Sequence, residues 1–294
     1  MLLIQAIING IFIGSVYGLI ALGLTLIFGV MKIINFAHGS FLMIGMFATF
    51  FFTSLSGINP YFSIILVCPL LFFLGFITQH FLLKSVLIAE HDIREPISVL
   101  LLTSGLWIFL DNLFLVFFGP DYHALPAPFS KLNWFFADTL LINKARFCAF
   151  IASWASAIGL YLFLQRSELG RSLKAVGQDR QMAGLLGIDV YKTYNIAFGI
   201  ACAIVGIAGA VLVPFYYVHP NVGILFGIKA FIIVVLGGLG SISGALLGGI
   251  IVGLVESFGG QFISATMTEG LIYIIFLAVL FFRPSGLFGL KQDW

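Results

Sequence analysis

The residues of this 294-residue chain that could do chemistry are few, and they fall in three places. Asn35, His38 and Ser40 stand in NFAHGS, between two long apolar runs. Asp111–Asn112 lies inside the apolar run WIFLDNLFLVFF. The charged stretch 166–192 holds eight of the 26 charged residues in the chain. Such groups can form hydrogen bonds, hold a proton or attract a charged partner.

None of these places has the spacing of a catalytic or nucleotide-binding motif. GILFGIK lacks the spacing of a phosphate loop, and GLGSISG has Ser243 where a dinucleotide-binding motif needs its third glycine. The sequence contains no HExxH motif, no Ser/His/Asp arrangement and no pair of catalytic carboxylates. Cys68, Cys148 and Cys202 fall in apolar segments without metal-binding spacing, and we interpret them as small core residues. We therefore expect neither an enzyme nor a bound cofactor or metal.

The composition explains why polar groups are so scarce. Hydrophobic residues make up 61% of the chain, charged residues only 9%, and the mean hydropathy is +1.14. A soluble domain cannot cover its surface with so little polarity, so we expect an integral membrane protein. The runs are too long and too uniformly apolar for a barrel, which favours helices that satisfy their own backbone groups. The cations are spread over short loops, which argues against a nucleic-acid surface. The predicted fold is an all-α polytopic membrane protein with a single transmembrane domain, 1–294.

About eight apolar segments are long enough to cross a bilayer. They lie near 3–30, 40–56, 61–83, 97–119, 143–165, 193–217, 227–258 and 267–283. The first has no basic region or cleavage site of a signal peptide, so we expect it to remain as a helix. Broken helices are expected near Asn35–Ser40 and Gly237–Ser243. The segment 227–258 would make a helix of about 48 Å, too long for a core of about 30 Å. We expect it to be a hairpin broken at GGLGSIS.

The positions of lysine and arginine give an orientation. Cytoplasmic loops carry an excess of these residues, which places the loop 166–192 inside and the loop 120–142 outside. If 227–258 is a hairpin, ten cations lie inside: 32, 84, 94, 166, 171, 174, 180, 192, 283 and 291. Four lie outside or near the outer interface: 131, 144, 146 and 229.

Glycines recur every four residues in two apolar regions, which is typical of helices that pack closely in lipid. The positions are Gly10, Gly14 and Gly18, then Gly240, Gly244 and Gly248, with Gly249 and Gly253 as a further pair. Each series adjoins one of the two expected breaks. Paired breaks in two halves of a membrane protein often mark a transport site, although the two halves here are only weakly alike.

Two interpretations remain open for each polar feature within the membrane. Asn35 and His38 either line a path or gate, or merely satisfy backbone groups where a helix ends. Ser40 is a candidate N-cap for the next helix. Asp111 is either a functional acid or a hydrogen bond between helices, because no cationic partner is evident.

The charged stretch has the pattern of a short amphipathic helix. Asp179 can cap it and Gly187 can end it. Met182, Leu185 and Leu186 then share one face, opposite Arg180. The alternative is an ordinary cytoplasmic loop that rests on lipid headgroups.

Four ordered motifs resemble the permease subunits of branched-chain (hydrophobic) amino-acid ABC importers, in particular the shorter of their two permease types. They are NGIFIGSVYGLIALGLTLIFGVMKIINFAHGSFLMIG, GRSLKAVGQDRQMAGLLGID, GIKAFIIVVLGGLGSISGALLGGIIVGLVES and FRPSGLFG. The resemblance implies a multi-pass protein of the bacterial inner membrane with a second permease subunit, two cytoplasmic ATPase subunits that bind the ATP, and a periplasmic binding protein.

The resemblance also implies roles for particular residues. Coupling to the ATPase would involve Gly170, Arg171, Lys174, Asp179, Arg180, Met182, Leu185, Leu186 and Gly187. A path or gate would involve Asn35, His38, Ser40, Gly238, Gly240 and Ser241. No buried cation–anion pair suited to a free amino acid is evident, so we expect selectivity to reside in the binding protein. Urea or amide transport by the same family, an ion-coupled secondary transporter and a channel remain as alternatives.

Overall fold

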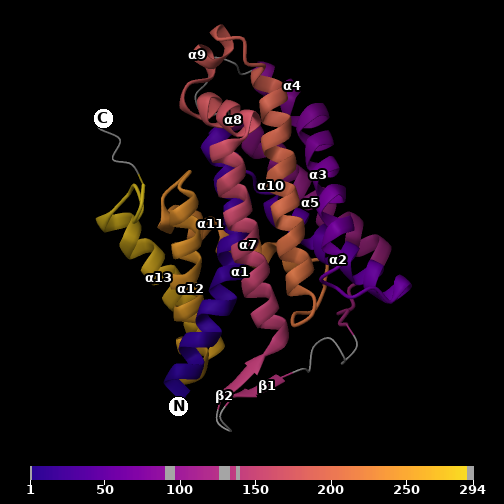
Figure 1. Cartoon of the computed structure of the whole chain (residues 1–294), viewed down its shortest axis with the longest axis vertical. Coiled ribbons are helices and arrows are strands. Elements are labelled where there is room, and N and C mark those ends of the chain that lie inside the picture. The colour runs from indigo at the N-terminus through magenta and orange to yellow at the C-terminus, as the bar shows by residue number, and fades with distance from the viewer. Residues whose placement is uncertain (1, 90–96, 126–132, 137–139, 290–294) are drawn as a thin grey trace.

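The chain folds into a bundle of helices in the computed structural model, which describes residues 2–89, 97–125, 133–136 and 140–289 (Figure 1). The helices are α1 (Leu2–Met31), α2 (His38–Ser56), α3 (Ile64–Thr78) with η1 (Gln79–Leu83) and α4 (Lys84–Ala89), α5 (Ile97–Phe118), α7 (Lys144–Arg166), α8 (Glu168–Gln178), α9 (Arg180–Leu185), α10 (Val190–Leu212), α11 (Val222–Gly237), α12 (Ile242–Phe262) and α13 (Ala265–Phe282). Two antiparallel strands, β1 (Asn133–Phe136) and β2 (Leu140–Asn143), precede α7.

The predicted all-α polytopic membrane fold is confirmed. Within the described residues, seven helical spans are long and apolar enough to cross a membrane, and α11 and α13 are shorter apolar helices. The segment expected to break at GGLGSIS does form two helices, because α11 ends at Gly237 and α12 begins at Ile242. They run antiparallel, with Gly237 against Gly244 and Ile233 against Gly248. The small strand pair was not predicted.

The loops gather at two ends of the bundle. The N-terminus and the strands lie at one end, and α8 and α9 lie at the other (Figure 1). The tail returns toward the turn between α11 and α12, where the Leu287 and Phe288 amides donate to the carbonyls of Leu236 and Gly237. The expected cytoplasmic cations 94 and 291, and Lys131, lie outside the described residues.

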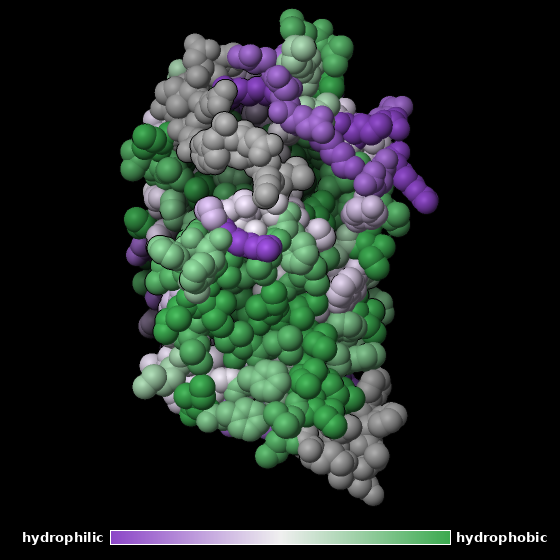
Figure 2. Space-filling view, turned by 90° about the vertical axis from the view of Figure 1, so that its left-hand side faces the viewer, coloured by the Kyte–Doolittle hydropathy of each residue, from purple (hydrophilic) through white to green (hydrophobic). Residues whose placement is uncertain are grey.

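One charged residue is not where the sequence placed it. Lys229, expected outside or near the outer interface, is 9% exposed in the middle of α11. Apolar side chains cover most of the height of the face shown in Figure 2, and hydrophilic residues gather toward its upper end. This arrangement is the one expected of a protein whose middle lies in lipid.

The two halves of the bundle exchange contacts in a reciprocal pattern. Helix α1 packs along α12, and α10 packs along α3; α1 also contacts α11, while α10 contacts α2. The contact between α1 and α12 runs along the predicted glycine series, where a Cβ atom on Gly14 would come within 2.7 Å of the Gly249 carbonyl oxygen. Contact this close requires glycine, because any larger residue would separate the backbones.

Candidate functional site

The first helix break returns into the bundle. The Asn35 side-chain oxygen accepts a hydrogen bond from the Ala37 amide at 3.0 Å, and the His38 Nε2 atom lies 2.9 Å from the Ile20 carbonyl oxygen. Ile20 precedes the end of α1 by three turns, so α2 begins inside the bundle and not at its edge. Both side chains satisfy backbone groups, yet Asn35 Nδ2 and His38 Nδ1 have no partner among the described residues.

Ser40 does not cap α2, contrary to the sequence expectation. Helix α2 begins at His38, with Ala37 in the cap position and no side-chain cap. The Ser40 hydroxyl instead donates to Asp111 Oδ1 at 2.7 Å, and Trp107 Nε1 donates to Asp111 Oδ2 at 2.7 Å. Asp111 therefore joins α2 to α5 by a hydrogen bond, which was one of its two interpretations.

The break that faces the first one is 213–221, before α11. Gly39 at the start of α2 lies directly against Gly223 at the start of α11, so close that a Cβ atom on Gly39 would overlap the Gly223 carbonyl oxygen. Two helix N-termini thus meet inside the bundle, and such ends present unpaired backbone N–H groups. The sequence indicated a different partner, Gly237–Ser243.

Gly238, Gly240 and Ser241 form the turn between α11 and α12. Gly238 (φ 101°) and Gly240 (φ 83°) have left-handed backbones that favour glycine. The Ser241 hydroxyl accepts from the Gly244 amide at 3.1 Å and caps α12. The 286–289 tail lies against Gly238, and Gly29 near the end of α1 lies beside Gly240. These residues are thus brought together with α1 and the tail, but not with Asn35 and His38.

A buried ion pair, which the sequence interpretation missed, lies between α11 and α12. Lys229 Nζ is 2.8 Å from Glu256 Oε2, and the Tyr17 hydroxyl donates to Glu256 Oε1 at 2.9 Å. The side chains of Lys229 and Glu256 are 11% and 31% exposed. Tyr17 stands halfway along α1. No pair suited to a free amino acid was evident from the sequence, and this pair is already satisfied between its own two members.

The signal for this pair was present in the sequence. Lys229 and Glu256 each interrupt an apolar run, and a charge within a membrane helix requires a partner. The two are far apart in the chain, and only Asp111 was weighed as an intramembrane acid.

Helices α8 and α9 form a platform beyond the end of α7. Helix α8, which the sequence interpretation did not identify, buries Leu173 and Val176 and exposes Arg171 and Lys174. Gly170 is buried where α8 leaves α7, since a Cβ atom there would overlap the Phe163 carbonyl oxygen. Gly170 therefore positions the platform and does not offer a contact surface.

Helix α9 has the predicted caps. Asp179 Oδ1 accepts from the amides of Gln181 and Met182 at 2.8 and 3.1 Å, and Gly187 follows the helix with φ 85°. Leu185 and Leu186 are 84% and 81% exposed. Two adjacent exposed leucines among charged residues are typical of a protein contact.

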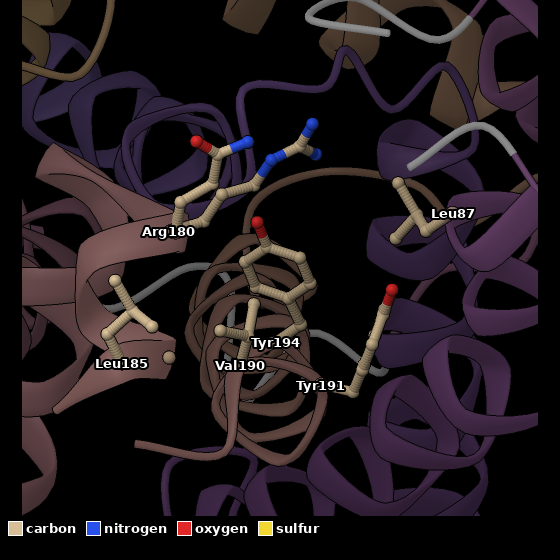
Figure 3. A pocket seen from close by; sticks show the side chains of 8 residues that line it. Leu87, Arg180, Leu185, Val190, Tyr191 and Tyr194 are labelled. Carbon is tan, nitrogen blue, oxygen red and sulfur yellow. The ribbon is translucent and has the colours of Figure 1, made fainter. Parts of the chain in front are cut away.

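A groove of about 370 Å³ separates α9 from α4 and the start of α10 (Figure 3). Arg180 extends across it above Tyr194, while Leu185 and Leu87 lie on opposite sides. Apolar and cationic groups therefore line one concave surface at the α8–α9 end. Among the described residues, no group of three or more metal-ligating side chains is found.

The sequence is similar to known transport proteins over nearly its whole length. The profile of the family described as "Branched-chain amino acid transport system / permease component" matches residues 6–280. The chain is 34% identical to the high-affinity branched-chain amino acid transport system permease protein BraD of Pseudomonas aeruginosa, over 97% of this chain and 95% of BraD. It is 30% identical to LivH of Escherichia coli, described by the same words, with the same coverage of both chains.

An archaeal relative extends the similarity. The probable branched-chain amino acid transport permease protein LivH of Methanocaldococcus jannaschii is 31% identical over 94% of this chain and 89% of its own length. No solved structure matches the chain.

Proposed function

Because this chain belongs to the family of branched-chain amino acid transport permeases, we propose that it is the membrane subunit of an ATP-driven importer in the bacterial inner membrane. It translocates branched-chain or other hydrophobic amino acids that a periplasmic protein delivers. As a multi-pass permease without catalytic residues of its own, the chain depends on other subunits for energy. In this proposal they are a second permease subunit and two cytoplasmic ATPase subunits.

The observation that carries ATP coupling is the exposed tip of α9. Leu185 and Leu186 project from the cation-rich end of the bundle, where no other described part of the chain covers them. In the proposal, Met182, Leu185 and Leu186 enter a groove on an ATPase subunit, and Arg171, Lys174 and Arg180 set the register. Asp179 and Gly187 act indirectly, because they fix the ends of α9.

Replacing Leu185 and Leu186 by Asp tests this contact. Two charges would enter an apolar groove, and the lost burial of two leucines corresponds to a loss of affinity on the order of 100-fold or more. We expect the double variant to insert into the membrane but to lose the ATPase subunits during purification. The matched control is Leu55→Asp, an equally exposed leucine (82%) in the last turn of α2, away from α8 and α9 (Figure 1). Normal assembly of the double variant would refute the coupling role.

An ion-coupled secondary transporter is less consistent with the acids in the bundle. Such transporters need membrane acids that are free to bind an ion or a proton. Asp111 already accepts two hydrogen bonds, and Glu256 is held by Lys229 and Tyr17. Among the acids of the described apolar helices, this leaves Glu269, in the second turn of α13, without such a partner. Among substrates, the names of the relatives favour branched-chain amino acids over urea or amides. Titration of the cognate binding protein with leucine and with urea distinguishes these two.

We propose further that the translocation path runs beside the meeting point of α2 and α11. Asn35 and His38 have polar atoms without described partners there, and both helix N-termini lie beside them. Ser40 holds α5 against this point through Asp111. Gly238, Gly240 and Ser241 belong to the gate at the α8–α9 end, where the turn between α11 and α12 contacts α1 and the tail.

A further inference from the structure

A groove with opposite charges on its two walls lies between α11 and α13. Its volume is about 320 Å³, within the range of about 300–1,000 Å³ typical of small-molecule sites. Lys229 lies on the α11 wall and Glu269 on the α13 wall. Most of the remaining lining is aliphatic and comes from Ile224, Ile228, Ile232 and Ile272.

Lys229 is held so that it can still donate into this groove. An ammonium group has three N–H donors. One reaches Glu256 Oε2 at 2.8 Å, and a second reaches the Tyr17 hydroxyl at a long 3.4 Å. One donor therefore remains. The result is a fixed cation at the edge of an apolar groove.

Glu269 presents a free acceptor on the opposite wall. It lies in the second turn of α13 and is exposed, with no hydrogen-bond or ion-pair partner among the described residues. A carboxylate on an apolar membrane helix is costly against lipid, so its surroundings must include water or a cation. The groove thus offers a donor for an anion and an acceptor for a cation, with aliphatic side chains between and around them.

We infer that this groove is a substrate subsite of the permease, in which Lys229 binds the carboxylate of a free amino acid and Glu269 binds its ammonium group. The isoleucines contact the aliphatic side chain of the substrate. The inference rests on the proposed function, which supplies a hydrophobic amino acid as cargo. It gives the permease a selectivity of its own, in addition to that of the binding protein.

A lipid with a zwitterionic headgroup has the same two charges and an aliphatic part. The choice of lipid around the complex distinguishes a bound amino acid from a bound lipid headgroup. Phosphatidylglycerol has no ammonium group, so the bilayer of phosphatidylglycerol nanodiscs does not itself supply a zwitterion that competes with the labelled amino acid.

The test measures equilibrium binding of labelled L-leucine to the assembled complex in phosphatidylglycerol nanodiscs, without the binding protein. Leucine should bind, and 4-methylpentanoate, which lacks the ammonium group, should bind about tenfold or more weakly, because a charge-assisted hydrogen bond is lost. Glu269→Gln should weaken leucine by a similar factor and leave 4-methylpentanoate unchanged. Asp121→Asn, which removes another exposed carboxylate outside the groove, should bind leucine as the unmodified protein does.

Two results would overturn the subsite. One is leucine binding by Glu269→Gln equal to that of Asp121→Asn. The other is that leucine does not bind, while phosphatidylethanolamine stays bound to the purified complex and is lost in Glu269→Gln. That result would assign the groove to lipid. Either result leaves the proposed function intact if the unmodified complex still transports leucine with its binding protein. Failure of that transport would instead refute the proposed function.

Discussion

At the scale of single residues, the pairing of Lys229 with Glu256 decides how charge is tolerated inside the bundle. A charge removed from water must find a partner, and the attraction in a low-dielectric site offsets only part of the desolvation cost. Removing one member of the pair therefore leaves the other as an unpaired charge whose desolvation cost is no longer offset. Removing both leaves an apolar contact that membrane helices form readily.

Lys229→Met should accordingly be more harmful than the double replacement Lys229→Met/Glu256→Leu. We expect the single change to lower the free energy of unfolding by about 2–3 kcal/mol, less than for a fully buried pair because the Glu256 side chain is 31% exposed. The double variant should recover most of this loss. Thermal unfolding of the purified protein and its variants, including Glu256→Leu alone, measures the coupling. Additive effects of the two single changes would contradict it.

Prediction from the sequence reached some of these residues and missed others for a physical reason. Asp179 and Gly187 were predicted as the ends of α9 because caps depend on neighbours only a few residues away. The partner of Lys229 depends on the packing of α11 against α12 and α1, which no local pattern encodes. The predicted capping role of Ser40 was wrong for the same reason, because its hydroxyl donates to Asp111 on another helix.

At the scale of helices, the bundle depends on places where two backbones touch. Gly39 and Gly223 bring the starts of α2 and α11 together, and the glycine series joins α1 to α12. Contacts of this kind replace the hydrophobic effect between helices in lipid. They should tolerate no added side-chain atom.

Gly39→Ala tests this at the meeting point. Its methyl group would overlap the Gly223 carbonyl oxygen, and separating α2 from α11 should cost about 1–3 kcal/mol. Gly105→Ala in α5 is the control, because a Cβ atom there meets no other atom within 4 Å. The control should be neutral or stabilised by up to about 1 kcal/mol, since alanine favours helix. Equal thermal midpoints for the two variants would contradict the close contact.

The helices themselves were largely predictable, because each apolar run has the length of a membrane crossing. The break before α11 was missed because PFYYV at 214–218 is apolar and extended the sixth segment to 217, whereas α10 ends at Leu212. Pro214 and Pro220 were the available signals of a helix end. Helix α8 was missed because the amphipathic pattern of this stretch was assigned only to the residues between Asp179 and Gly187.

At the scale of the whole molecule, the proposed function assigns one end of the bundle to a protein partner and its middle to lipid and substrate. Helix α9, with its exposed leucines, lies at one end of the bundle (Figure 1), whereas Asn35, His38 and Lys229 are buried within the bundle. In the proposed function, the binding of the ATPase subunits and the passage of the amino acid therefore take place in different parts of the chain. The central claim of the proposed function is that ATP hydrolysis by a partner subunit drives the passage of the amino acid.

Uptake of L-leucine into proteoliposomes tests that claim most directly. The vesicles would contain this chain with its second permease and ATPase subunits, and the binding protein would be added outside. The account predicts uptake that stops when internal ATP is depleted and persists when ionophores collapse all ion gradients. Gradient-driven uptake by this chain alone, without ATP or partners, would contradict it.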